Sequence, residues 1–166
     1  RDINFKDHKV IVLHNENWHT GVIGIVASRI SDRFNRPAIL ISTKDGIGRG
    51  SGRSVENFHL FEALTSCEEF LREYGGHQYA CGLTILEEKL PGFIKMMNEL
   101  AQNTMTAENL IPSLVIDMDI NLRDIDYKAV EDIAGLEPFG EGNPEPVFCS
   151  RSLRLAQPLR VLKGEH

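Results

Sequence analysis

KVIVLHNENWHTGVIGIVASRISDRFNRPAILI, residues 9–41, contains two short apolar runs on either side of a helix-like segment. The runs at 9–14 and 38–41 are rich in branched residues, as in buried strands. The segment 21–34 has apolar residues at helical spacing, namely Val22, Val26, Ile30 and Phe34 with Ile23 and Ala27 beside them. Thr20 is the expected N-cap. A strand, a helix and a strand in this order predict a βαβ unit with a parallel strand pair, and therefore an α/β fold.

The residues that follow predict a mixed sheet with flanking helices. Helices are expected at 58–64, 67–71 and 87–103, a strand at 80–86, and a glycine turn at 75–77. A polar stretch at 102–109, followed by Pro112, indicates a boundary. We therefore expect one domain at 1–108 and a second at 109–166.

For the second domain, the sequence predicts a partial, truncated antiparallel β module that is OB-like. A half-buried strand is expected at 114–120, a short helix at 126–134, and antiparallel strands at 147–150 and 153–162. The sequence ends at His166 without a closing element.

Composition limits the classes of function. The chain has 166 residues, a net charge of −6 and three cysteines without a CxxC spacing. No apolar run approaches the roughly 20 residues of a membrane span, and the cysteines fit a reduced, cytoplasmic setting. The acidic balance argues against broad nucleic-acid binding, but Lys44, Arg49 and Arg53 lie close together and allow a local cationic site.

The segment Gly48-Arg-Gly-Ser-Gly-Arg-Ser54 is the first candidate phosphate site. Its arginines and serines are suitable phosphate donors, and its glycines would let a ligand approach the backbone. The candidate binding residues are Arg49, Gly50, Ser51, Arg53 and Ser54. In a regular strand Arg49, Ser51 and Arg53 would share one face; alternatively, the glycines interrupt the strand. The structural alternative for Arg53 is a surface ion pair.

The segment Gly75-Gly76-His77 is the second candidate. The glycines would form a turn that presents His77 as a donor or proton carrier, although His77 could instead cap a carbonyl. His19 is a third candidate; it either binds the ligand or orients the helix that begins near Gly21. Gly24 either opens that helix N-terminus to an anion or allows close helix-on-strand packing.

Several motifs together resemble the RecJ family of single-strand-specific DNA exonucleases, in the DHH phosphoesterase superfamily. The matching segments are 17–29, 48–54, 61–64 and 74–83, which are similar to the DHH-associated domain, and 138–148, which is similar to the start of the OB-fold domain. The family's Asp-His-His tripeptide does not occur, because Asp7-His8 is followed by Lys9. The resemblance therefore implies a C-terminal fragment without the DHH domain.

The resemblance also implies roles for single residues. Ser51 and Arg53 would bind DNA phosphate near the 5′ end, Gly75 and Gly76 would shape the turn, and His77 would act as the catalytic group at the reacting phosphate. We expect no metal site in this chain; Mn²⁺ or Mg²⁺ would belong to the missing DHH domain. Single-stranded DNA and that domain are the expected partners, and a single-strand-binding protein is a further candidate. The alternatives are a stand-alone nucleic-acid binding module and a DHH enzyme for small nucleotides.

Overall fold

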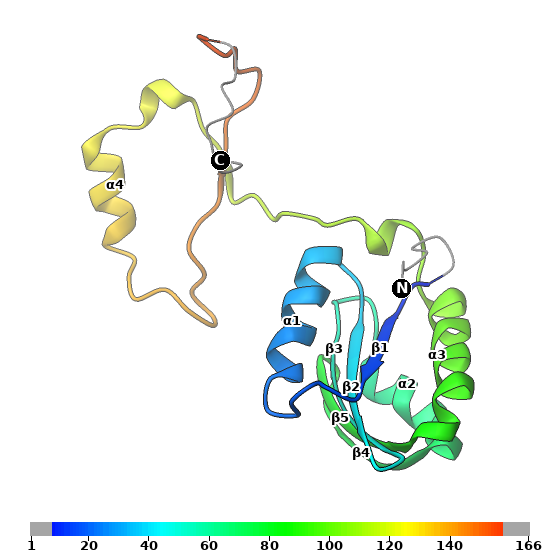
Figure 1. Cartoon of the computed structure of the whole chain (residues 1–166). Helices are drawn as coiled ribbons and strands as arrows, with labels where there is room; N and C mark the ends of the chain where they lie inside the picture. The colour runs from blue at the N-terminus through cyan, green and yellow to red at the C-terminus, as the bar shows by residue number, and fades with distance from the viewer. Residues whose placement is uncertain (1–7, 158–166) are drawn as a thin grey trace. The chain divides into compact units, whose positions relative to one another are not determined.

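The computed structural model describes residues 8–157 and divides into two compact units between Pro112 and Ser113. This boundary lies close to the one expected after residue 108. In the first unit, five strands form one sheet in the order β1-β2-β3-β5-β4 (Figure 1). The strands are β1 (Ile11–Asn15), β2 (Ala38–Lys44), β3 (Ile47–Arg53), β4 (Leu71–Gly76) and β5 (Ala80–Leu86). The helices are α1 (Ile23–Phe34), α2 (Leu60–Ser66) and α3 (Leu90–Thr104), with 3₁₀ turns at Glu68–Phe70, Glu87–Lys89 and Glu108–Leu110.

The βαβ unit is confirmed. Strands β1 and β2 pair in parallel, with Ile11 opposite Ala38, and the other neighbouring strands of this sheet pair antiparallel. The predicted N-cap is wrong, because α1 starts after Val22 without a side-chain cap. The expected apolar row also differs from the buried one. Val22 and Val26 are 50% and 39% exposed, whereas Ile23 and Ala27 face the sheet.

Helices cover both faces of the sheet, with α1 on one side and α2 and α3 on the other (Figure 1). The larger core lies under α2 and α3 and includes Ile39, Ile41, Leu83 and Ile85 of the sheet with Leu60, Leu64, Phe93 and Met97 of the helices. The smaller core lies under α1 and contains Ile11, Ala38 and Leu40 with Ile23 and Ala27. The burial of this apolar area is the main contribution to the stability of the unit.

The glycines of β3 face the larger core. A Cβ on Gly50 would lie 2.9 Å from Leu83 side-chain carbons, and a Cβ on Gly52 would lie 2.8 Å from Leu60 Cδ2. Only glycine, which has no side chain, fits at positions 50 and 52. The glycines do not interrupt β3, which is continuous from Ile47 to Arg53. This packing gives the glycines a structural reason, while Gly50 also lines an open cavity together with Arg49 and Gly82.

Strand β4 was not predicted from the sequence. The helix expected at 67–71 is a single 3₁₀ turn at Glu68–Phe70, and the chain then enters β4. The pairing register shifts between Leu71 and Glu73, which marks a β-bulge at Arg72. Tyr74 packs toward the core, with its ring centroid 5.9 Å from that of Phe61.

The second unit is described up to residue 157. Helix α4 (Tyr127–Ala134) confirms the predicted helix, and the Asp126 carboxylate accepts a hydrogen bond from the Ala129 N–H at 2.8 Å as its N-cap. Strand β6 (Met118–Asp119) is shorter than expected, and a 3₁₀ turn follows at Leu122–Asp124. Strand β7 (Phe148–Cys149) pairs with β6 in parallel, which differs from the antiparallel pairing expected for 147–150. Of the strand expected at 153–162, residues 153–157 are not in a strand, and 158–162 lie outside the described residues.

Among the residues that the structure describes, no helix combines the length and hydropathy needed to span a bilayer.

Candidate functional site

The outer face of β3 carries the predicted donors. Because β3 is continuous, Arg49, Ser51 and Arg53 alternate with the core-facing glycines and lie on the face that α1 partly covers. Across the sheet, Arg53 lies opposite Ala80 of β5, and Ser51 lies opposite Gly82. The surface beside the donors is therefore made of small residues.

Arg53 is half-buried and held by its own strand. Its Nη1 donates to Ser51 Oγ at 3.2 Å and to the Gly52 carbonyl oxygen at 2.8 Å. Within residues 8–157 neither Arg53 nor Arg49 forms an ion pair with a carboxylate. The surface ion pair considered for Arg53 is therefore absent from the described part of the chain, and its remaining N–H groups can bind an anion.

Ser54 has a structural role. Its Oγ donates to the Phe58 carbonyl oxygen at 2.7 Å, and its N–H donates to the Tyr79 carbonyl oxygen at 2.9 Å. The hydroxyl hydrogen is therefore used inside the protein, where it holds the segment before α2, and the N–H fixes the end of β3 to the β4–β5 turn.

His77 lies at the start of the β4–β5 turn and is exposed. Its N–H donates to the Ala80 carbonyl oxygen at 2.9 Å, which places His77 opposite Ala80. Since Ala80 is opposite Arg53, His77, Ala80 and Arg53 form one row across β3, β5 and the turn that follows β4. The two predicted phosphate segments therefore meet at the same end of the sheet.

The two glycines before His77 differ from each other. Gly76 has a φ of +135°, and a Cβ there would lie 2.3 Å from the Ala80 carbonyl oxygen. A Cβ on Gly75 would meet nothing within 4 Å. Both glycines end β4 and precede the turn. Because only Gly76 has a positive φ and no room for a Cβ, only this position requires glycine.

Cys81 forms a hydrogen bond to the turn that contains His77. Its Sγ donates to the His77 carbonyl oxygen at 3.1 Å. Burial raises the pKa of the Cys81 thiol above its ordinary value, while the charge of Arg53 acts in the opposite direction. The protonated thiol is therefore the form that serves as the donor at neutral pH.

His19 orients the start of α1. Its Nδ1 accepts a hydrogen bond from the Gly21 N–H at 3.0 Å, and its carbonyl oxygen accepts one from the Val22 N–H at 3.0 Å. This supports the structural alternative considered for His19. The same residue also lines a cavity of about 480 Å³ together with Lys44 and Arg49, which brings His19 close to the Arg49 end of β3.

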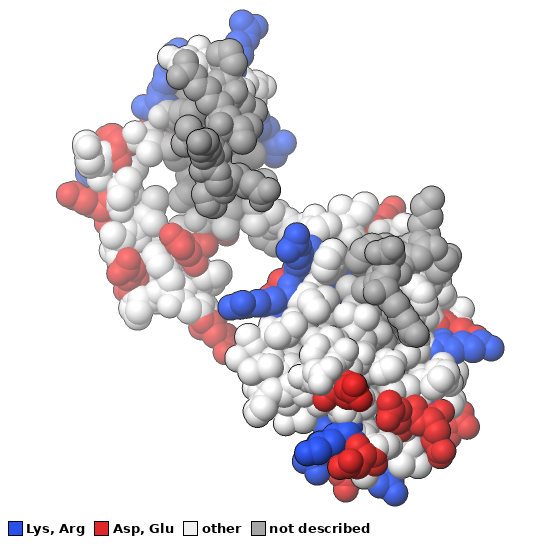
Figure 2. All heavy atoms as spheres, viewed as in Figure 1, with Lys and Arg blue, Asp and Glu red and all other residues white. Residues whose placement is uncertain are grey.

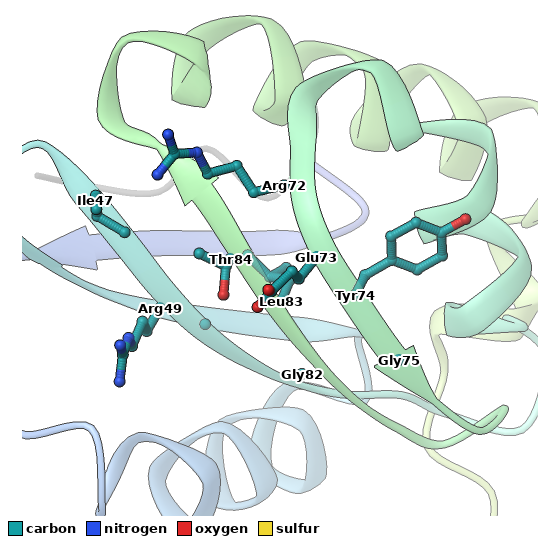
Figure 3. A pocket seen from close by; sticks show the side chains of 10 residues that line it. Ile47, Arg49, Arg72, Glu73, Tyr74, Gly75, Gly82, Leu83 and Thr84 are labelled. Atoms are coloured by element: carbon teal, nitrogen blue, oxygen red, sulfur yellow. The ribbon is translucent and has the colours of Figure 1, made fainter.

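A wider, open cavity of about 990 Å³ lies over β3, β5 and β4. Figure 3 shows Glu73 and Thr84 in the middle of this cavity, with Arg49 projecting to one side and Arg72 to the other. Arg72, Glu73 and Thr84 were not found from the sequence. The alternation of 80–86 could have placed Thr84 on this face, but the other two depend on the unpredicted strand β4.

Charged groups are not spread evenly over the first unit. In Figure 2, acidic and basic side chains gather together at the lower end of this unit, and the visible face of the described residues has no continuous basic surface. The arginines of β3 are therefore local donors, in agreement with the net charge of −6.

No group of three or more His, Cys, Asp or Glu side chains in residues 8–157 is arranged to hold a metal ion. The described part of the chain therefore does not fit the Mn²⁺ or Mg²⁺ that the resemblance implies for the whole protein.

Comparisons with known proteins agree with this arrangement. Residues 7–103 match the DHHA1 domain family, and residues 116–166 match the RecJ OB domain family. The chain is 42% identical over 142 residues to the single-stranded-DNA-specific exonuclease RecJ of Bacillus subtilis, covering 84% of this chain and 18% of that protein. It is 34% identical to RecJ of Haemophilus influenzae, covering 83% of this chain and 25% of that protein.

A solved structure shows the same likeness. RecJ of Thermus thermophilus, crystallised with Mn²⁺, superposes with a TM-score of 0.77 at 33% identity, covering 91% of this chain and 23% of that chain. The chain thus spans 18% to 25% of the length of these relatives. The chain belongs to the DHHA1 domain family, and its two domains correspond in kind and order to the DHHA1 and OB domains of RecJ proteins.

Proposed function

We propose that this chain is the substrate-binding part of a RecJ-like 5′→3′ exonuclease that hydrolyses single-stranded DNA. The half-buried guanidinium of Arg53, which forms no ion pair among the described residues, carries this proposal. A cation that is held in one position and is not paired with a carboxylate is suited to binding an anionic ligand. The relatives of this chain are single-stranded-DNA-specific exonucleases. The backbone phosphate of single-stranded DNA is such an anion.

Each residue has a distinct task in this proposal. Arg53 holds a phosphate near the 5′ end through its free N–H groups, and Ser51 adds a hydroxyl donor. His77 donates to the phosphate at which water attacks phosphorus and the bond to the leaving oxygen breaks. Arg49 and the Nε2 of His19 contact the phosphate backbone further along the strand.

Divalent metal ions would assist the attacking water in the metal-binding DHH part of the same protein. The residues described here bind, orient and stabilise charge. In this proposal the chain needs the DHH part for hydrolysis, and a cytoplasmic location fits a DNA-repair enzyme.

The OB domain favours DNA strands over small nucleotides. Residues 116–166 match the RecJ OB domain family, and OB folds bind oligonucleotides. A stand-alone binding module remains the second candidate, because the outer face of β3 could hold a phosphate without the DHH part.

A cleavage assay separates these functions. The purified chain, incubated with Mn²⁺ and 5′-labelled single-stranded DNA, is expected to release no nucleotides above the protein-free blank, whereas the complete gene product cleaves the strand. In the complete protein, His77→Ala should lower the cleavage rate by about 100-fold or more, since one donor to a developing charge contributes about 10²–10³ in kcat. The matched control is His14→Ala, at an exposed histidine of β1. Mn²⁺-dependent cleavage by the pure chain that is lost in His77→Ala would contradict the proposal.

A further inference from the structure

Helix α1 approaches the sheet through its small residues. Ala27 and Ser31 are buried against the sheet, and Gly24 lies one turn earlier on the same side. The helix packs against both β2 and β3. The first turn of α1 therefore lies directly over the outer face of β3.

The space beside Gly24 is filled by the phosphate-binding pair. A Cβ on Gly24 would lie 3.1 Å from Ser51 Oγ and 3.3 Å from Arg53 Nη2. These two side chains are joined by the hydrogen bond from Arg53 Nη1 to Ser51 Oγ. Any side chain at position 24 must therefore move one or both members of the pair.

We propose that Gly24 is a positioning residue for phosphate recognition, because the backbone of α1 holds the Arg53 guanidinium and the Ser51 hydroxyl in their binding orientation. This inference rests on the proposed function and extends it to a residue that touches no substrate. Arg53 has several rotatable bonds, and a surface arginine would lose rotamer entropy on binding. The contact with α1 restricts this freedom before the ligand arrives, so that less entropy is lost on binding.

The direction of the stability change distinguishes this role from simple packing. Alanine is favoured over glycine in helices by up to about 1 kcal/mol, so Gly24→Ala gives α1 a better helix former. The nearest atoms are the end of a flexible arginine and a serine hydroxyl, and both can yield by a few tenths of an ångström. Gly24→Ala is therefore expected to keep or raise the melting temperature and to weaken phosphate binding.

A double-mutant cycle tests the inference in the complete gene product, with EDTA present so that the strand is bound but not cut. The probe is a 5′-phosphorylated single-stranded oligonucleotide measured by fluorescence anisotropy. Gly24→Ala should raise Kd by about three- to tenfold, corresponding to partial loss of a charge-assisted hydrogen bond, and Gly24→Val should raise it further. In a background that lacks both side chains of the pair (Arg53→Ala with Ser51→Ala), Gly24→Ala should cause no further loss. Ile25→Ala, on the solvent side of the same helix turn, is the control and should leave Kd unchanged.

Two results would overturn the inference. One is an unchanged Kd for both Gly24→Ala and Gly24→Val while Arg53→Ala weakens binding. The other is an equal loss from Gly24→Ala with the Arg53–Ser51 pair present and with both side chains replaced by alanine, which would mean that Gly24 acts through some other group. If Arg53→Ala itself leaves Kd unchanged, the proposed function fails, and this outcome is distinguishable from a failure at Gly24.

Discussion

Arg53→Ala is expected to raise the Kd for 5′-phosphorylated single-stranded DNA by about 10- to 100-fold, since hydrogen bonds to charged groups contribute about 1.5–3 kcal/mol. The guanidinium is held by Ser51 and Gly52 and forms no ion pair among the described residues, so its charge is available to the phosphate. The measurement is an anisotropy titration at several salt concentrations. The slope of log K against log salt should become shallower by about 0.7–1, as for one lost phosphate contact.

Two further variants control for charge and geometry. Arg53→Lys keeps the positive charge but loses the planar fork, so its Kd should fall between those of the wild type and Arg53→Ala. Lys95→Ala removes the same charge from α3, on the other face of the sheet, where Lys95 pairs with Glu99 at 3.7 Å. Equal weakening by Arg53→Ala and Lys95→Ala would mean that only net charge matters, and the assigned site would then be wrong.

Gly76→Ala is expected to destabilise the first unit by about 2–5 kcal/mol, through strain at a φ reserved for glycine and a backbone clash. A Cβ at this position would lie 2.3 Å from the Ala80 carbonyl oxygen and 2.7 Å from Cys81 Cα, and neither backbone atom can move without opening the β4–β5 hairpin. The melting temperature should fall by roughly 10 °C or more, since each kcal/mol corresponds to about 4–8 °C in a domain of this size. Thermal unfolding followed by circular dichroism measures the change.

The neighbouring glycine provides a matched control. Gly75→Ala makes the same chemical change one residue earlier, where the added methyl group meets nothing within 4 Å. Its melting temperature should stay within a few degrees of the wild type. If the two variants unfold at the same temperature, the turn geometry described for Gly76 is incorrect.

The sequence predicted the parts of the fold that depend on local pattern. The βαβ unit follows from two branched apolar runs around a helical period. Helix α4 agrees with the helix expected at 126–134, and the structure adds Asp126 as its N-cap. Helix α3 agrees with the expected 87–103 because its apolar residues repeat at helical spacing and Pro91 lies in its first turn. In each case the local preference and the tertiary packing agree.

The incorrect predictions concern segments whose conformation depends on tertiary packing. Residues 71–76 are polar and end in two glycines, so they lack the apolar alternation of a strand, yet β5 supplies the hydrogen bonds that form β4. The packing role of the β3 glycines was not predicted, because Leu83 and Leu60 are brought against Gly50 and Gly52 only by folding. Arg72 reaches the open cavity through a bulge, which no single-sequence pattern encodes.

Part of the geometry around the candidate residues follows from the sequence. Arg49, Ser51 and Arg53 were expected to share one face if residues 48–54 form a regular strand, and β3 is continuous. Ser54 and His19 have structural hydrogen bonds that sequence reasoning could not assign, because their partners are backbone groups brought close by folding. The row that joins Arg53 to His77 through Ala80 depends on the strand order β3-β5-β4, which the sequence does not reveal.

A titration of the ¹⁵N-labelled chain with an unlabelled 5′-phosphorylated oligonucleotide, followed by amide chemical shifts, tests most directly whether the outer face of β3, β5 and β4 binds a DNA phosphate. We expect the largest shift changes at Ser51, Arg53 and His77, with those of α3 unchanged. Changes confined to α2 and α3, or none at DNA concentrations that saturate the complete protein, would contradict the account.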